Sequence, residues 1–153
     1  MEERTYVLSM FQTFSHFRNI RVTFLGGDVH CGGFGCLFAA MNPEGTSHYL
    51  MYQVVSSAIG NIPPPSAVIN NVNNSAKTMN AGPVGTKEKM LKVFKEDVDG
   101  KPLKKGKLLG RRNYCIFQGE EQGGITATLQ VESIDYNAPS KPYGIYIPPL
   151  NKV

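Results

Sequence analysis

The chain has 153 residues, of which 41% are hydrophobic and 18% are charged, and it carries a formal net charge of +4. This balance excludes a largely disordered chain, and no apolar run approaches the ~20 residues that a membrane-spanning helix needs. The amino-terminal residues lack the pattern of a secretory signal, and three cysteines, an odd number, predict no compact disulfide framework. We therefore expect a cytoplasmic protein with a single domain over residues 1–153 and no transmembrane segment.

The positive charge is concentrated in one segment. Residues 75–112 contain eleven basic and four acidic residues, a net +7, while the remaining five basic and eight acidic residues give −3. Gly and Pro interrupt this tract, which predicts a mobile, solvated basic loop at about residues 74–112. An attraction for phosphate groups or for an acidic surface is the alternative. Between residues 87 and 112 the only aromatic residue is Phe94, which argues against a nucleic-acid platform and against nucleic acid as a partner.

Residues 2–17 carry apolar side chains at spacings of three and four, which predicts an amphipathic helix. The apolar stripe consists of Tyr6, Val7, Met10, Phe11, Phe14 and Phe17. We interpret these side chains as candidates for the core. Residues 20–25 are rich in β-branched and aromatic residues, so a short buried strand is expected after the helix.

Glycines then crowd the chain at positions 26, 27, 32, 33 and 35, where they would let the backbone turn sharply and approach a ligand. Residues 37–41 and 49–56 are strand candidates. The intervening Asn42, Pro43, Glu44 and Gly45 have the residue types of a turn, so we expect a hairpin.

The second half of the chain predicts two short helices and three strands. A helix at 66–73 would follow three prolines, and residues 88–94 would form a turn or two of helix. Strands are expected at 113–118, 124–134 and 143–147. In the second of these, Ile125, Ala127, Leu129 and Val131 alternate with polar residues, so one face should be buried.

The densest chemical signal is the Asp-x-His pair formed by Asp28 and His30, which directly follows an apolar strand and is bracketed by glycines. Residues two apart in an extended segment point the same way, so the carboxylate and the imidazole can converge on one point. Such a pair suits a divalent metal or general acid-base chemistry at the carboxyl end of a strand. A turn aspartate beside a hydrogen-bonded histidine is the structural alternative.

The string RVTFLGGDVHC at residues 21–31 closely resembles the Gly-Asp-Val-His segment of eukaryotic PhoD-like phosphatases, relatives of the calcineurin-like metallophosphoesterases. The resemblance continues in order through nearly the whole chain. Its further segments are VSSAI at 55–59, PPP at 63–65, DVDGKP at 97–102, RNYC at 112–115, KPY at 141–143 and IPPL at 147–150.

The resemblance implies hydrolysis of phosphomonoesters or phosphodiesters at a centre of divalent or trivalent metal ions. It carries metal ligation or phosphate contact onto Asp28 and His30 as catalytic and metal-site residues. The earlier ligand motifs of such phosphatases have no counterpart in this chain. We therefore expect the carboxyl-terminal portion of a phosphatase domain, inactive alone, that needs the missing amino-terminal half or another chain. A noncatalytic interaction or structural module that retains the sheet is the alternative.

The expected fold class is α/β or α+β, with the amino-terminal helix packed on one face of a mixed sheet. By the resemblance, it would be one half of a metallophosphoesterase-type β-sandwich with flanking helices, whose exposed seam would favour self-association. Two minor hypotheses concern Cys31 and Cys36 as zinc ligands and Gly32 to Gly35 as a phosphate cradle; we favour close packing for both. His16 and His48 are expected at the surface.

Overall fold

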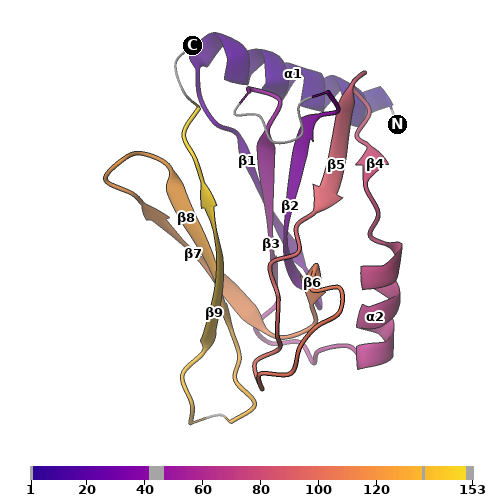
Figure 1. The fold of residues 1–153 in the computed structure, drawn as a ribbon, viewed down its shortest axis with the longest axis vertical. Helices are drawn as coiled ribbons and strands as arrows, with labels where there is room; N and C mark the ends of the chain where they lie inside the picture. The colour runs from indigo at the N-terminus through magenta and orange to yellow at the C-terminus, as the bar shows by residue number, and fades with distance from the viewer. Residues whose placement is uncertain (1, 42–46, 136, 151–153) are drawn as a thin grey trace.

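The computed structural model describes residues 2–41, 47–135 and 137–150. The chain folds into two β-sheets and two helices, an α+β arrangement that confirms the expected class (Figure 1). In chain order the elements are α1 (Glu2–Arg18), β1 (Thr23–Asp28), β2 (Gly32–Ala39), β3 (Met51–Ser57), α2 (Ser66–Ser75), β4 (Met79–Asn80), β5 (Thr86–Met90), β6 (Leu108–Leu109), β7 (Asn113–Gly119), β8 (Ile125–Val131) and β9 (Lys141–Ile147).

The larger sheet has the strand order β1-β3-β2-β5-β4, with β6 paired to β2. Strands β1 and β3 run parallel, with Thr23 opposite Tyr52 and Asp28 opposite Ser57, while β2 is antiparallel to both of its neighbours β3 and β5. The antiparallel pairing of β2 with β3 confirms the expected strand pair, although its connecting turn at 42–45 lies outside the described residues. Among the described strands, β1 pairs only with β3, so it forms an edge of the sheet.

The prediction of a buried strand at 20–25 is wrong in two respects. The strand covers Thr23–Asp28, and the side chain of Leu25 is 66% exposed because β1 lies at the sheet edge. The expected turns at the glycines are wrong as well. Gly26 and Gly27 pair with Val55 and Ser56 of β3, so their backbone is held in the sheet.

Glycines of β2 permit close contact between strands rather than turns. A Cβ atom on Gly32 would lie 2.5 Å from the side-chain nitrogen of Asn113, and one on Gly33 would lie 2.7 Å from Leu108. Any larger side chain here would displace Asn113 of β7 or Leu108 of β6 from its contact with β2. Packing, not a phosphate cradle, therefore explains these two glycines.

Helix α1 covers one end of the larger sheet, as Figure 1 shows, but the residues of its apolar stripe are exposed. Only the Phe11 ring, 5.3 Å from Phe24 of β1 between centroids, has an aromatic contact with the described strands. Its buried residues are Leu8, Gln12 and Ser15, and Leu8 packs with Leu37 and Met51. Gln12 donates a hydrogen bond to the Thr86 hydroxyl at 2.8 Å, and Ser15 donates one to the carbonyl of Ile20 at 2.7 Å. The buried side of the helix thus carries polar groups, with Gln12 bound to β5 and Ser15 to the segment before β1, which corrects the assignment of the stripe to the core.

The main core lies between the two sheets. It combines Phe34 and Val54 of the larger sheet and Phe94 with Ala127, Leu129, Val131, Tyr143 and Ile147 of the antiparallel sheet β7-β8-β9. Phe94 contacts both sides, with ring centroids 6.3 Å from Phe34 and 5.2 Å from Tyr143. The burial of Ala127, Leu129 and Val131 confirms the alternation predicted for that strand.

The segment around Phe94 is a strand followed by loop, so the helix expected at 88–94 is wrong. Residues Thr86–Met90 pair with β2 as β5, because β2 offers a row of backbone hydrogen-bond partners, whereas a short isolated helix is unstable. The tract at 74–112 also contains β4 and β6. The helix expected at 66–73 and the last three strands are confirmed as α2, β7, β8 and β9.

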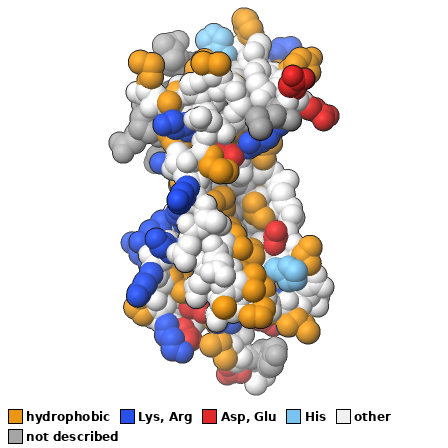
Figure 2. All heavy atoms as spheres, turned by 90° about the vertical axis from the view of Figure 1, so that its right-hand side faces the viewer, with side chains coloured by type: hydrophobic (Ala, Val, Ile, Leu, Met, Phe, Trp, Pro, Cys, Tyr) orange, Lys and Arg blue, Asp and Glu red, His pale blue; other side chains and the backbone are white. Residues whose placement is uncertain are grey.

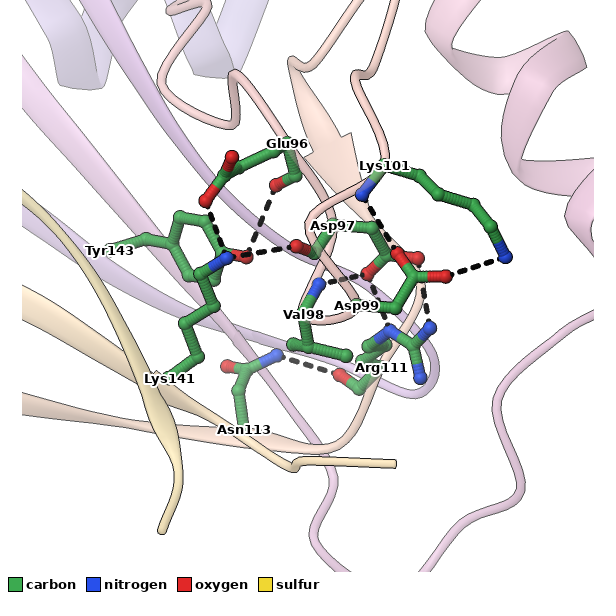
Figure 3. Close-up of polar contacts among 9 residues, drawn as sticks. All are labelled: Glu96, Asp97, Val98, Asp99, Lys101, Arg111, Asn113, Lys141 and Tyr143. Atoms are coloured by element: carbon green, nitrogen blue, oxygen red, sulfur yellow. Dashed lines mark hydrogen bonds and ion pairs between the residues drawn. The ribbon is translucent and has the colours of Figure 1, made fainter. Parts of the chain in front are cut away.

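A polar cluster fastens the turn at 96–99 to its surroundings (Figure 3). Arg111 donates to both carboxylate oxygens of Asp97, at 2.6 and 2.8 Å. Lys141 on β9 pairs with Glu96 at 2.6 Å and donates to the carbonyl of Asp97, while the Tyr143 hydroxyl donates to the carbonyl of Glu96. The turn is thereby joined both to the chain before β7 and to β9.

Replacing Asp97 by asparagine should lower the free energy of unfolding by about 1 kcal/mol at pH 7, since a bidentate but partly exposed ion pair is lost. The hydrogen bonds from Arg111 lower the pKa of Asp97 below its ordinary value. The stabilisation is therefore complete above the unfolded-state pKa and is lost as the pH falls through the lowered folded-state pKa. Urea unfolding at a series of pH values should show the difference between the two proteins shrink toward zero in acid. Glu121→Gln, at an exposed position, should show no comparable loss, and a difference for Asp97→Asn that stays constant with pH would contradict the assignment.

Candidate functional site

Asp28 ends strand β1 and stabilises the turn that follows. Its Oδ1 atom accepts hydrogen bonds from the backbone N–H groups of His30 at 2.8 Å and Cys31 at 2.7 Å. The Asp28 carbonyl accepts a further bond from Ala58, just beyond β3. The carboxylate thus has the structural role of a turn aspartate. Each carboxylate oxygen has two acceptor positions, so this role leaves the group able to contact a ligand.

His30 and Asp28 line the same open cavity of about 370 Å³, between the end of β1 and helix α2. Cys31 lies with them on this wall. The rest of the lining is apolar and comprises Val55, Pro64, Val68, Ile69, Val72, Met90 and Leu108. The two residues singled out from the sequence are therefore brought to one cavity, with a carboxylate, an imidazole and a thiol facing apolar side chains.

The thiol of Cys31 is not poised to react. Its partial burial, followed by the negative charge of Asp28 and a hydrogen bond with that carboxylate, raises the pKa of Cys31 to about 11. The thiol therefore stays protonated at neutral pH, where nucleophilic attack is not favoured. Cys36 lies buried within β2, and burial also raises its pKa.

The residues present do not complete a metal site. Within residues 2–41, 47–135 and 137–150, no three His, Cys, Asp or Glu side chains are grouped so that they could hold a metal ion. Asp28 and His30 offer one carboxylate and one imidazole, whereas metal centres that bind phosphoesters use several such ligands. Neither His16 nor His48 lines this cavity; their rings lie 4.6 Å from each other, near the end of α1.

A buried hydrogen-bond cluster supports the end of β3, the neighbour of Asp28. The Asn113 side chain donates to the Ser57 hydroxyl at 2.9 Å and accepts from the Ser57 backbone N–H at 3.1 Å. The Ser57 hydroxyl in turn donates to the carbonyl of Arg111 at 2.9 Å. Because Ser57 lies opposite Asp28 in the register, this cluster ties the site to the second sheet. Local sequence patterns gave no signal for it.

Helix α2 is the other part of the site that sequence reasoning missed. Its residues Val68, Ile69 and Val72 form a wall of the cavity, although the sequence indicated only a short helix after three prolines. Nothing local in the sequence placed these apolar side chains in the same cavity as Asp28 and His30.

The model of the family described as PhoD related phosphatase matches residues 2–143. The chain therefore belongs to the PhoD-related phosphatase family, which confirms the resemblance drawn from its motifs and implies a phosphoester as the class of substrate. Comparison with curated proteins and with solved structures gave no match. In the described part of the chain, neither helix is both long and apolar enough to cross a membrane.

Proposed function

We propose that this chain contributes one wall and one pair of polar groups to the active site of a metal-dependent phosphoester hydrolase. The observation that carries the proposal is that Asp28 and His30 line one cavity, in a chain that belongs to a phosphatase family. In this scheme Asp28 and His30 contact a metal ion or the phosphate of the substrate. The apolar residues of α2 line the same open cavity.

The remaining ligands come from outside the described residues, either from an upstream part of a longer phosphatase domain or from another chain. Two polar groups cannot by themselves hold a two-metal centre. The 153-residue chain alone should therefore show little or no phosphatase activity.

Complementation tests this proposal. The purified chain is mixed with the upstream half of a PhoD-related phosphatase domain, and hydrolysis of p-nitrophenyl phosphate is followed with added divalent and trivalent metal ions. Restored activity that disappears in the Asp28→Asn variant supports the proposal. Metal-dependent hydrolysis by the 153 residues alone, if it required Asp28, would refute the need for a second half.

A noncatalytic binding or structural module is the second candidate. It is favoured by the turn-stabilising role of Asp28, whose Oδ1 is already hydrogen-bonded to two backbone groups. This candidate predicts that complementation produces a stable complex without hydrolysis. Activity in the complex would exclude it.

Self-association of the isolated chain is expected from its exposed apolar surface. On α1, Tyr6 is 66% and Phe17 is 79% exposed, and β1 has no partner on its outer edge among the described strands. Light scattering should show a mass that rises with protein concentration. The double variant Met10→Gln/Phe17→Gln should reduce the association, while the same change at the separate exposed positions Ile59 and Ile62 should have less effect. A monodisperse monomer at all concentrations would contradict this expectation.

A further inference from the structure

A second cavity, of about 580 Å³, lies against a different face of α2 from the Asp28–His30 cavity. Its lining comes from α2 and from the tract at 97–111, and the two cavities share only Pro64, Ile69 and Leu108. The polar lining residues are Ser66, Asn70, Asn73 and Asn74 of α2 and Asp97, Lys104, Lys105 and Arg111 of the tract. The second cavity is thus more polar than the first, although both have apolar lining residues.

The charge of this lining is positive. It contains Lys104, Lys105 and Arg111 against a single acid, Asp97, and both carboxylate oxygens of Asp97 are bound by Arg111 (Figure 3). In the described part of the chain, no carboxylate lies within ion-pair distance of Lys104 or Lys105, and both lysines are exposed. Figure 2 shows lysine and arginine side chains gathered along one side of the face that carries α2. Two ammonium groups therefore remain available to an anion.

The backbone segment that follows these lysines is hydrogen-bonded to α2. The buried side chain of Asn73 donates to the carbonyl of Leu108 at 2.9 Å and accepts from the backbone N–H groups of Lys107 and Leu108 at 3.1 and 2.9 Å. Lys107 also donates its ammonium group to the carbonyl of Ala76 at the end of the helix. Preceding Lys107, the chain turns at Gly106, which has a positive φ of 57° and packs its α-carbon against the Phe94 carbonyl. The cavity is preorganised rather than formed by a free loop.

The lining also contains neutral hydrogen-bond donors, the side-chain amides of Asn70 and Asn74. No side-chain hydrogen bond to the described residues is found for Asn70 or Asn74, both of which are exposed on α2. An amide NH₂ and an ammonium group are both suited to the oxygens of a phosphate, whereas Asn73 has its amide already occupied. Of the three asparagines of α2 that line the cavity, Asn70 and Asn74 therefore keep donors for a ligand.

We propose that this second cavity is a binding site for a phosphate-type oxyanion, held by Lys104 and Lys105 with the amide of Asn70. Its volume admits a phosphate group attached to a small organic residue as well as inorganic phosphate. The site is separate from the Asp28–His30 cavity and takes part in no bond-breaking step. Its occupancy is measured without turnover, so its failure and the failure of the proposed hydrolase function are distinguishable.

Inorganic phosphate is the probe, titrated by isothermal calorimetry into the full 153-residue chain in metal-free buffer at constant ionic strength. Asn70→Asp places a negative charge in the cavity and should weaken phosphate binding about tenfold or more. Asn71→Asp makes the same change at the next residue of α2, which does not line the cavity, and should weaken binding less than about threefold. Lys104→Ala/Lys105→Ala should match Asn70→Asp, whereas the matched pair Lys92→Ala/Lys95→Ala, elsewhere in the basic tract, should not.

Three results would overturn the assignment. Equal weakening by Asn70→Asp and Asn71→Asp, or by the two lysine pairs, would show diffuse attraction to the basic tract. A loss of binding in His30→Ala would place the anion in the first cavity. Absence of saturable binding to the unaltered chain would leave no site at all. The altered side chains are exposed, and circular dichroism confirms that each variant folds before its affinity is compared.

Discussion

Replacing Asp28 by asparagine in the complemented protein should lower kcat/KM for p-nitrophenyl phosphate by about 100-fold or more. Asparagine keeps an oxygen that can accept the hydrogen bonds from His30 and Cys31, so the turn after β1 is retained while the charge is lost. The substitution therefore separates a chemical role of the carboxylate from its structural role. His30→Gln, which removes the imidazole, should have an effect of similar size.

The matched controls are Asp135→Asn and His48→Gln. Asp135 is also exposed and also accepts a backbone hydrogen bond two residues on, from Asn137 at 2.9 Å, but it does not line the cavity. Neither control should change kcat/KM by more than about twofold. If Asp28→Asn retained full activity in an active complex, the carboxylate would serve the turn alone, and the assignment of Asp28 to the chemistry would fail.

Truncation of Phe94 to alanine should lower the free energy of unfolding by about 3–5 kcal/mol, the range for a large aromatic residue removed from a core. The ring has no exposed surface and lies between Phe34 of the larger sheet and Tyr143 of the smaller one. Its loss leaves a cavity at the contact between the sheets. Urea unfolding, followed by far-ultraviolet circular dichroism, measures the change.

Phe117→Ala supplies the comparison, because Phe117 lies on β7 with 40% of its side chain exposed and outside the main core. It should cost about 1 kcal/mol or less. Equal destabilisation by the two variants would mean that the contact between the sheets does not depend on Phe94.

Regular periodicity in the sequence predicted elements well where each element depends mainly on its own residues. The alternation around Ala127 and Leu129 identified β8, and the prolines before Ser66 identified the start of α2. The face of α1 could not be predicted in the same way. Its apolar stripe is a property of the helix, whereas the side that packs is decided by partners such as Thr86, which lies 74 residues from Gln12.

The site shows the same division between local and distant information. Asp28 and His30 are two residues apart, and both line one cavity. The segment between them is a turn closed by the Asp28 carboxylate, and not the extended segment from which a common direction was predicted. The apolar wall of α2 and the link from Asn113 to Ser57, 56 residues apart, depend on how the strands pair. From the sequence, Lys104 and Lys105 were predicted to lie in a solvated loop. The hydrogen bond that fixes their segment joins Asn73 to Leu108, and these two residues are far apart in the sequence.

Asp28 lies at the end of an edge strand, so its position links extension of the sheet to completion of the site. A further strand added beside β1 would extend the sheet and bring its own terminal residues next to the Asp28 carboxylate. Sheet extension and completion of the site would then be one equilibrium, so turnover would rise with the concentration of the added strand and saturate by mass action.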